Sequence, residues 1–109
     1  NIVGDVKGKT CIIVDDIIDS GGTIVNAAQA LVDRGASEVH VYITHGVLSG
    51  SAVEKIKRSK IKNMVVTDTI DNSYKVKKTK NIEILSISNL LGEAIKRISN
   101  STSVSDLFK

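Results

Sequence analysis

The 109-residue sequence contains no proline or tryptophan, one cysteine and only three aromatic residues. A single cysteine excludes an internal disulfide and fits a reducing compartment, so we expect Cys11, within an apolar run, to be a buried structural thiol. So few aromatic rings provide no stacking platform for nucleobases. Without proline, the turns depend on glycine, serine and asparagine.

Long apolar runs are also absent. No stretch approaches the roughly 20 residues that cross a bilayer, and no signal peptide opens the chain, which predicts a cytoplasmic protein without a membrane partner. The net charge of +3 is too small to indicate a nucleic-acid partner. The lysine-rich stretches 55–62 and 75–80 are interpreted as solvated surface, with steering of anions as the alternative.

Strand and helix patterns alternate along a length that suits one domain, residues 1–109. Strands are predicted at residues 10–14, 39–44, 63–67 and 82–87, helices at 22–34, 50–58 and 90–99, and a polar loop at 68–81. This alternation predicts an α/β fold, a mostly parallel sheet with flanking helices. The unbroken apolar run of the first strand predicts that helices cover both faces of the sheet.

The segment after the first strand has the features of a phosphate cradle. It lies at the carboxyl end of a parallel strand, where ligands of such sheets bind. Residues 19–23 precede a helix, so several backbone N–H groups lack an internal partner. Gly21 and Gly22 allow a sharp turn and close approach of an anion, Ser20 and Thr23 add hydroxyl donors, and the helix dipole favours a dianion by up to ~2 kcal/mol.

Two carboxylates complete the pattern. Asp15 and Asp16 point to opposite sides of the strand end, so at least one faces the pocket. There a carboxylate suits two vicinal hydroxyls, or Mg²⁺ carried by a ligand. Phosphate at one end and a diol at the other predict a 5-phosphoribose ligand. The predicted site residues are Asp15, Asp16, Asp19, Ser20, Gly21, Gly22 and Thr23.

Two other interpretations account for part of this segment. Asp19 or Ser20 could simply cap the helix, which accounts for one acid and not for three within five residues. A phosphorylated signalling receiver could pair Asp15 and Asp16 with Asp68, but residues 19–23 would then have no task, and no suitably placed lysine ends the fourth strand.

Residues 11–23 resemble the 13-residue signature of the type I phosphoribosyltransferase fold. Residues 4–9, 44–50, 66–70 and 103–108 resemble, in order, the ribose-phosphate diphosphokinases (phosphoribosyl diphosphate synthetases). The resemblance covers the whole chain as the C-terminal, ribose 5-phosphate-binding domain of a longer two-domain enzyme. The start at Asn1, without an initiator methionine, is consistent with a piece of a longer protein.

This resemblance implies transfer of a diphosphoryl group from ATP to ribose 5-phosphate with Mg²⁺, by a homo-oligomer. It implies that Asp15 and Asp16 bind the ribose hydroxyls, that residues 19–23 bind the 5-phosphate, and that Ser103 and Ser105 help to bind a regulatory phosphate. The family's ATP-binding segments, metal ligands and catalytic Lys and Arg precede this domain. We therefore expect no catalytic or metal-ligating residue here and an inactive fragment; His45 belongs to a structural His-Gly turn.

Two further functions stay open. A nucleobase phosphoribosyltransferase fragment would share the cradle, but it would need a base-recognising hood and would not carry the 103–108 tail. A non-catalytic regulatory homologue would bind the active enzyme or its regulators. The residues upstream of Asn1 would separate these possibilities.

Overall fold

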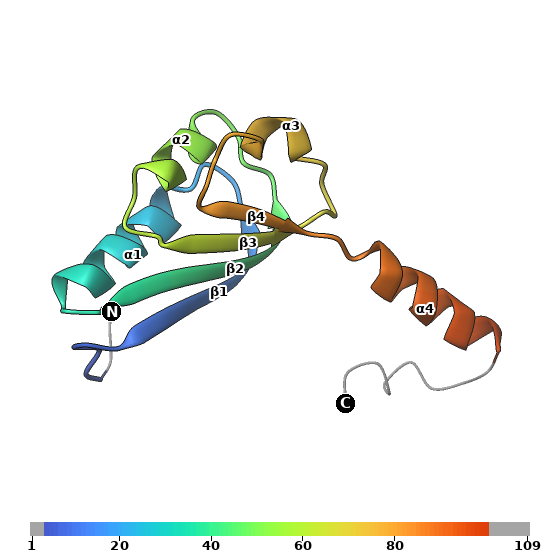
Figure 1. Ribbon diagram of the computed structural model, residues 1–109, viewed down its shortest axis with the longest axis horizontal. Helices are drawn as coiled ribbons and strands as arrows, with labels where there is room; N and C mark the ends of the chain where they lie inside the picture. Colours follow the sequence, from blue (N-terminus) through green and yellow to red (C-terminus); the bar gives the residue numbers. More distant parts are fainter. Residues whose placement is uncertain (1–3, 101–109) are drawn as a thin grey trace.

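The computed structural model describes residues 4–100. Strands and helices alternate along the chain (Figure 1). They are β1 (Thr10–Ile18), α1 (Gly22–Asp33), β2 (Glu38–Gly46), α2 (Ala52–Lys57), β3 (Asn63–Thr67), α3 (Ser73–Val76), β4 (Ile82–Leu85) and α4 (Ser88–Ser99). No helix in this part of the chain is long and apolar enough to span a membrane.

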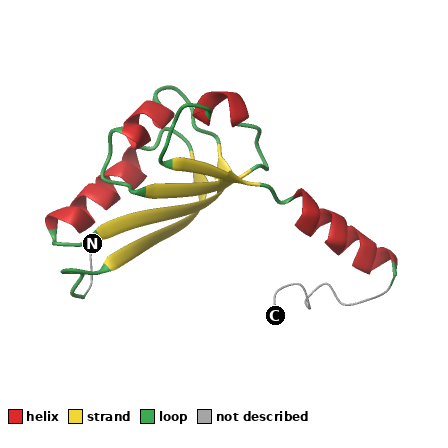
Figure 2. Cartoon of the chain, in the orientation of Figure 1, coloured by secondary structure: helices red, strands yellow, loops and turns green. Residues whose placement is uncertain are grey.

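The four strands form one sheet in the order β1-β2-β3-β4, and each neighbouring pair is parallel. Three helices, α1, α2 and α3, lie on one side of it, whereas α4 extends away beyond β4 (Figures 1 and 2). The predicted α/β fold with a parallel sheet is therefore confirmed. Because all four strands run in the same direction, their carboxyl ends lie at the same end of the sheet.

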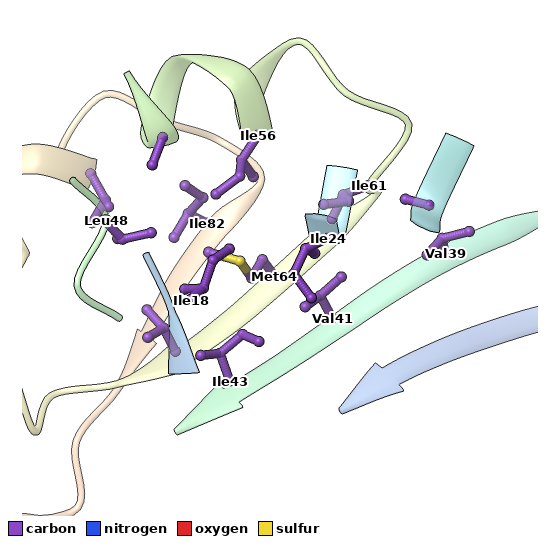
Figure 3. Close-up of a cluster of buried hydrophobic side chains, with 14 of the residues drawn as sticks. Ile18, Ile24, Val39, Val41, Ile43, Leu48, Ile56, Ile61, Met64 and Ile82 are labelled. Carbon is purple, nitrogen blue, oxygen red and sulfur yellow. The ribbon is translucent and has the colours of Figure 1, made fainter. Parts of the chain in front are cut away.

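The hydrophobic core fills the space between the sheet and these three helices (Figure 3). Alternate residues of β2 and β3 point into it, as the two-residue period of a strand requires. Val39, Val41, Met64 and Val66 have no exposed surface. The helices contribute Ile24, Ala28 and Ile56 from the other side.

The opposite face of the sheet is open, which corrects the prediction that the first strand is covered on both faces. Ile12 is 56% exposed and Val14 is 74% exposed. Cys11 is only partly buried, so the predicted buried thiol is also wrong. The apolar side chains of α4 contribute nothing to the core, because none of its residues is buried.

Several element boundaries differ from the predictions by one to four residues, and two differences have a clear physical reason. β1 continues to Ile18 because its polar and apolar residues alike stay paired with β2, as far as Ile18 opposite Gly46. The predicted loop 68–81 contains the one-turn helix α3, which is too short to show a helical period. Its start is fixed by the Asp71 carboxylate, which accepts a hydrogen bond from the Ser73 N–H at 3.0 Å.

Candidate functional site

The turn between β1 and α1 forms a hollow of about 230 Å³ at the carboxyl ends of the strands. Gly21 makes the turn possible, because its φ of 86° is left-handed and suits a residue without a side chain. Ile18, 2% exposed, anchors the start of the turn in the core. The hollow is lined by Asp15, Ile17, Ile18, Asp19, Ser20, Gly21, Gly22, Thr23 and Ile24.

Unused hydrogen-bond donors gather at this turn. The first intrahelical bond of α1 runs from the Val25 N–H to the Gly21 carbonyl at 3.0 Å. Within the part of the chain that the structure describes, the N–H groups of Gly22, Thr23 and Ile24 therefore have no acceptor, and no side chain caps the helix. Three free donors and the positive end of a 12-residue helix suit an anion.

The hydroxyl groups of Ser20 and Thr23 are also free. Neither takes part in a hydrogen bond with any residue between 4 and 100. Both residues line the hollow together with Gly21 and Gly22. The structure thus brings the predicted cradle residues 19–23 together around one space, with donors available to a phosphate.

The structure places the two paired acids differently. Asp15 lines the hollow, and its Oδ1 accepts a hydrogen bond from the Asp16 N–H at 2.7 Å. Asp16 does not line the hollow. One carboxylate is thus positioned beside the cradle, and the role of Asp16 stays a prediction.

A second turn supports the cradle, which the sequence predictions missed. The Ser49 hydroxyl donates to Asp19 Oδ1 at 2.5 Å, and the Ser49 N–H donates to the Asp19 carbonyl at 3.0 Å. The Val47 N–H donates to the Ile18 carbonyl at 2.9 Å. The available signal was topological: residues 46–49 follow β2, whose carboxyl end must lie beside that of β1.

Polar residues also gather at the carboxyl ends of β2 and β3. His45 Nδ1 lies 2.8 Å from the Thr69 hydroxyl and does not line the hollow. The Ile87 N–H donates to Asp68 Oδ1 at 2.9 Å and lowers the pKa of that carboxyl, with a smaller contribution from Ser86. Asp68 therefore braces β3 against the segment after β4. Between residues 4 and 100, no three His, Cys, Asp or Glu side chains form a group that could hold a metal ion.

The two lysine-rich stretches come together at the opposite end of the sheet, near the amino ends of β3 and β4. Lys57, Lys78 and Lys80 line an open cavity of about 480 Å³ beside the amino end of β4. Lys57 lies in the last turn of α2, and Lys78 lies shortly after α3. A cation near a helix C-terminus stabilises the helix dipole, which gives these lysines a structural explanation. Ser103 and Ser105 lie outside the described residues, and their predicted role stays a prediction.

Comparison with known proteins gives consistent results. A family model described as the phosphoribosyl synthetase-associated domain matches residues 1–109. Proteins named ribose-phosphate pyrophosphokinase from Hyphomonas neptunium and Bordetella pertussis are 60% and 55% identical over 108 residues, 99% of this chain. The chain spans about 35% of the length of these relatives.

A solved structure shares the fold. The crystal structure of phosphoribosylpyrophosphate synthetase from Mycobacterium smegmatis has a TM-score of 0.84 and 40% identity, covering 91% of this chain and 33% of that one. These comparisons support a synthetase domain; they do not support the C-terminal placement that the sequence resemblance predicted. The chain belongs to the family of phosphoribosyl synthetase-associated domains.

Proposed function

We propose that this chain binds ribose 5-phosphate for a ribose-phosphate diphosphokinase, which converts ATP and ribose 5-phosphate to AMP and phosphoribosyl diphosphate. The observation that carries the proposal is the set of free N–H donors at Gly22, Thr23 and Ile24 beside the carboxylate of Asp15. A phosphate needs several donors, and a sugar diol needs an acceptor. The relatives' names support the same substrate class.

The contribution of this chain to the reaction is positioning. Residues 19–23 hold the 5-phosphate at the helix N-terminus, and Asp15 accepts hydrogen bonds from ribose hydroxyls. The sequence resemblance implies that Asp16, which does not line the hollow in the structure, is a second acceptor for the ribose hydroxyls. Fixing the sugar at both ends directs its 1-hydroxyl away from the cradle, so that ATP bound by another part of the enzyme can approach in line.

The fit of Mg²⁺ differs from the fit of the phosphate. Mg²⁺ prefers six oxygen ligands and usually keeps several waters when it is bound with substrate phosphates. Residues 4–100 hold no cluster of ligating side chains for a resident ion. We propose that Mg²⁺ is bound together with ATP in the intact enzyme, as the sequence resemblance implies.

The remaining features of the proposal concern the intact protein. We propose a homo-oligomer, because the sequence resemblance implies one, and a cytoplasmic protein without a nucleic-acid partner, as the sequence patterns predict. The C-terminal placement of the domain in a two-domain enzyme stays a prediction. The number of residues encoded on each side of this sequence tests that placement: C-terminal placement in a synthetase of the relatives' length requires about two thirds of the residues before Asn1, since this chain spans about 35% of them, and most of them after Lys109 would contradict it.

Binding and turnover together test the proposed function. The intact protein should bind ribose 5-phosphate more tightly than inorganic phosphate or ribose in calorimetric titrations, since only the sugar phosphate uses both ends of the site. It should release AMP from ATP and Mg²⁺ only when ribose 5-phosphate is present. Binding of ribose 5-phosphate without AMP release would favour a non-catalytic homologue. Release of pyrophosphate from phosphoribosyl diphosphate when a nucleobase is added would favour a phosphoribosyltransferase.

A further inference from the structure

The turn at the end of β2, here called the bracing turn (residues 46–49), makes four hydrogen bonds to Ile18 and Asp19. The Val47 and Leu48 N–H groups donate to the Ile18 carbonyl, the Ser49 N–H donates to the Asp19 carbonyl, and the Ser49 hydroxyl donates to Asp19 Oδ1. Backbone bonds fix the position of the cradle. The side-chain bond does something else, because it fixes the direction of a carboxylate.

The bracing turn is itself held firmly. The Asn72 side chain, 1% exposed, donates from Nδ2 to the Gly46 carbonyl at 2.6 Å. Lys75 Nζ donates to the carbonyls of Val47 and Leu48 at 3.1 and 3.3 Å. Leu48 is 1% exposed and packs in the core. Ser49 is therefore presented to Asp19 from a rigid support.

The direction of the Asp19 carboxylate matters because aspartate is among the preferred acceptors for free N–H groups at a helix start. Asp19 lies two residues before Gly21, the residue that immediately precedes α1, and yet no side chain among the described residues caps this helix. The short bond from Ser49 occupies Asp19 Oδ1 instead. The donors of Gly22 and Thr23 consequently stay free for a ligand.

We propose that Ser49 is a positioning residue, which holds the Asp19 carboxylate away from the start of α1 so that the N–H groups there bind phosphate. This inference rests on the proposed function for its ligand. Without Ser49, the carboxylate would compete with phosphate for the same donors and would place a negative charge beside it. Loss of the serine hydroxyl therefore weakens phosphate binding through Asp19 and not through lost contact with the ligand.

Four variants of the intact protein test this role. Ser49→Ala removes the hydroxyl, Ser49→Thr keeps it, and Asp19→Ala removes the carboxylate, alone and combined with Ser49→Ala. Ser51→Ala is the matched control, since Ser51 is an exposed serine two positions along whose side chain bonds to none of the residues 4–100. Calorimetry measures ribose 5-phosphate affinity, and steady-state kinetics separate KM from kcat.

Ser49→Ala should weaken ribose 5-phosphate binding roughly tenfold, about the effect of one hydrogen bond to a charged group. Its KM for ribose 5-phosphate should rise while kcat and the KM for ATP stay unchanged. Ser49→Thr and Ser51→Ala should stay within about twofold of wild type. In the Asp19→Ala background, Ser49→Ala should have no further effect. An equal loss in that background, or failure of threonine to restore affinity, would overturn the inference.

A ligand-free measurement separates this inference from the proposed function. In Ser49→Ala, the released carboxylate should cap the helix and move the amide proton resonance of Gly22 or Thr23 downfield, whereas Ser49→Thr should leave both resonances in place. If the wild type binds no ribose 5-phosphate, the proposed function fails, and this spectrum still decides the role of Ser49. Unchanged amide resonances in Ser49→Ala would refute it.

Discussion

Replacing Gly22 by valine tests the cradle with little cost to the fold. Gly22 has an ordinary φ, and a Cβ built on it meets no atom within 4 Å. Valine is no worse than glycine in a helix, so stability should stay within about 1 kcal/mol of wild type. The isopropyl group would instead stand in the hollow that Gly22 lines.

The expected loss of binding can be worked out from the donors at the turn. Displacing the phosphate from two N–H groups, at about 1.5–3 kcal/mol for each hydrogen bond to a charged group, removes 3 kcal/mol or more. This corresponds to a loss of more than about a hundredfold in affinity for ribose 5-phosphate. Calorimetric titration measures the affinity, and urea denaturation of the same protein measures the stability.

Gly21→Ala is the matched comparison, and it separates strain from occupancy. The φ of Gly21 is 86°, and an added Cβ would lie 3.7 Å from the Ala52 Cβ, an ordinary contact. Alanine there should cost about 1–2 kcal/mol of stability through its left-handed conformation. The sequence predicted that Gly21 and Gly22 both allow the sharp turn, but of the two only Gly21 has a left-handed φ in the structure. Wild-type affinity in Gly22→Val, or a stability loss as large as that of Gly21→Ala, would refute this reasoning.

Further predictions concern the acids, the tail and the fragment. Asp15→Asn should weaken ribose 5-phosphate binding by about 1.5–3 kcal/mol and inorganic phosphate binding far less; parallel losses would indicate collapse of the turn. The pKa of Asp68 is lowered from its ordinary value of 3.8 by the Ile87 N–H. The ionised Asp68 carboxylate therefore contributes its full stabilisation above pH 3.8, and this stabilisation is lost as the pH falls through the lower pKa of the folded state. Asp68→Asn should accordingly make the acid-induced loss of stability shallower, as measured by circular dichroism during a pH titration. Ser105→Ala in the intact enzyme should change regulation by ADP or phosphate without changing ribose 5-phosphate affinity, and unaltered regulation would reduce the tail to packing. The 109-residue chain alone should release no AMP; turnover within a factor of ten of the intact enzyme would contradict that.

Local patterns predicted the fold well where one segment determines its own structure. β3 has the bounds that its apolar run predicted, and α1 ends at Asp33, one residue before the prediction, beside the left-handed Gly35. β1 is longer than predicted because its pairing with β2, and not its own polarity, decides where it ends. The coverage of the sheet was predicted wrongly, since apolar residues on the open face do not reveal whether anything packs on them.

The site, like the fold, was predicted where one segment determines its own structure and missed where distant segments meet. The sequence predicted the cradle because its donors and glycines are adjacent in the chain. Ser49 could not be found in this way, because its partner Asp19 is 30 residues away and the bond depends on the register of β1 with β2. Strand geometry predicted that at least one of Asp15 and Asp16 faces the pocket, and the structure shows that Asp15 lines the hollow.

The most direct measurement of the central claim is an amide-resolved NMR titration of the intact protein with ribose 5-phosphate. The account predicts that the amides of Gly22, Thr23 and Ile24 shift most, because they donate to the phosphate. Inorganic phosphate should move the same amides at higher concentration and leave Asp15 unmoved, whereas the sugar phosphate should move Asp15 as well. The largest shifts beside Lys57 and Lys80, or no shift at residues 19–24, would contradict the assignment of this turn as the phosphate site.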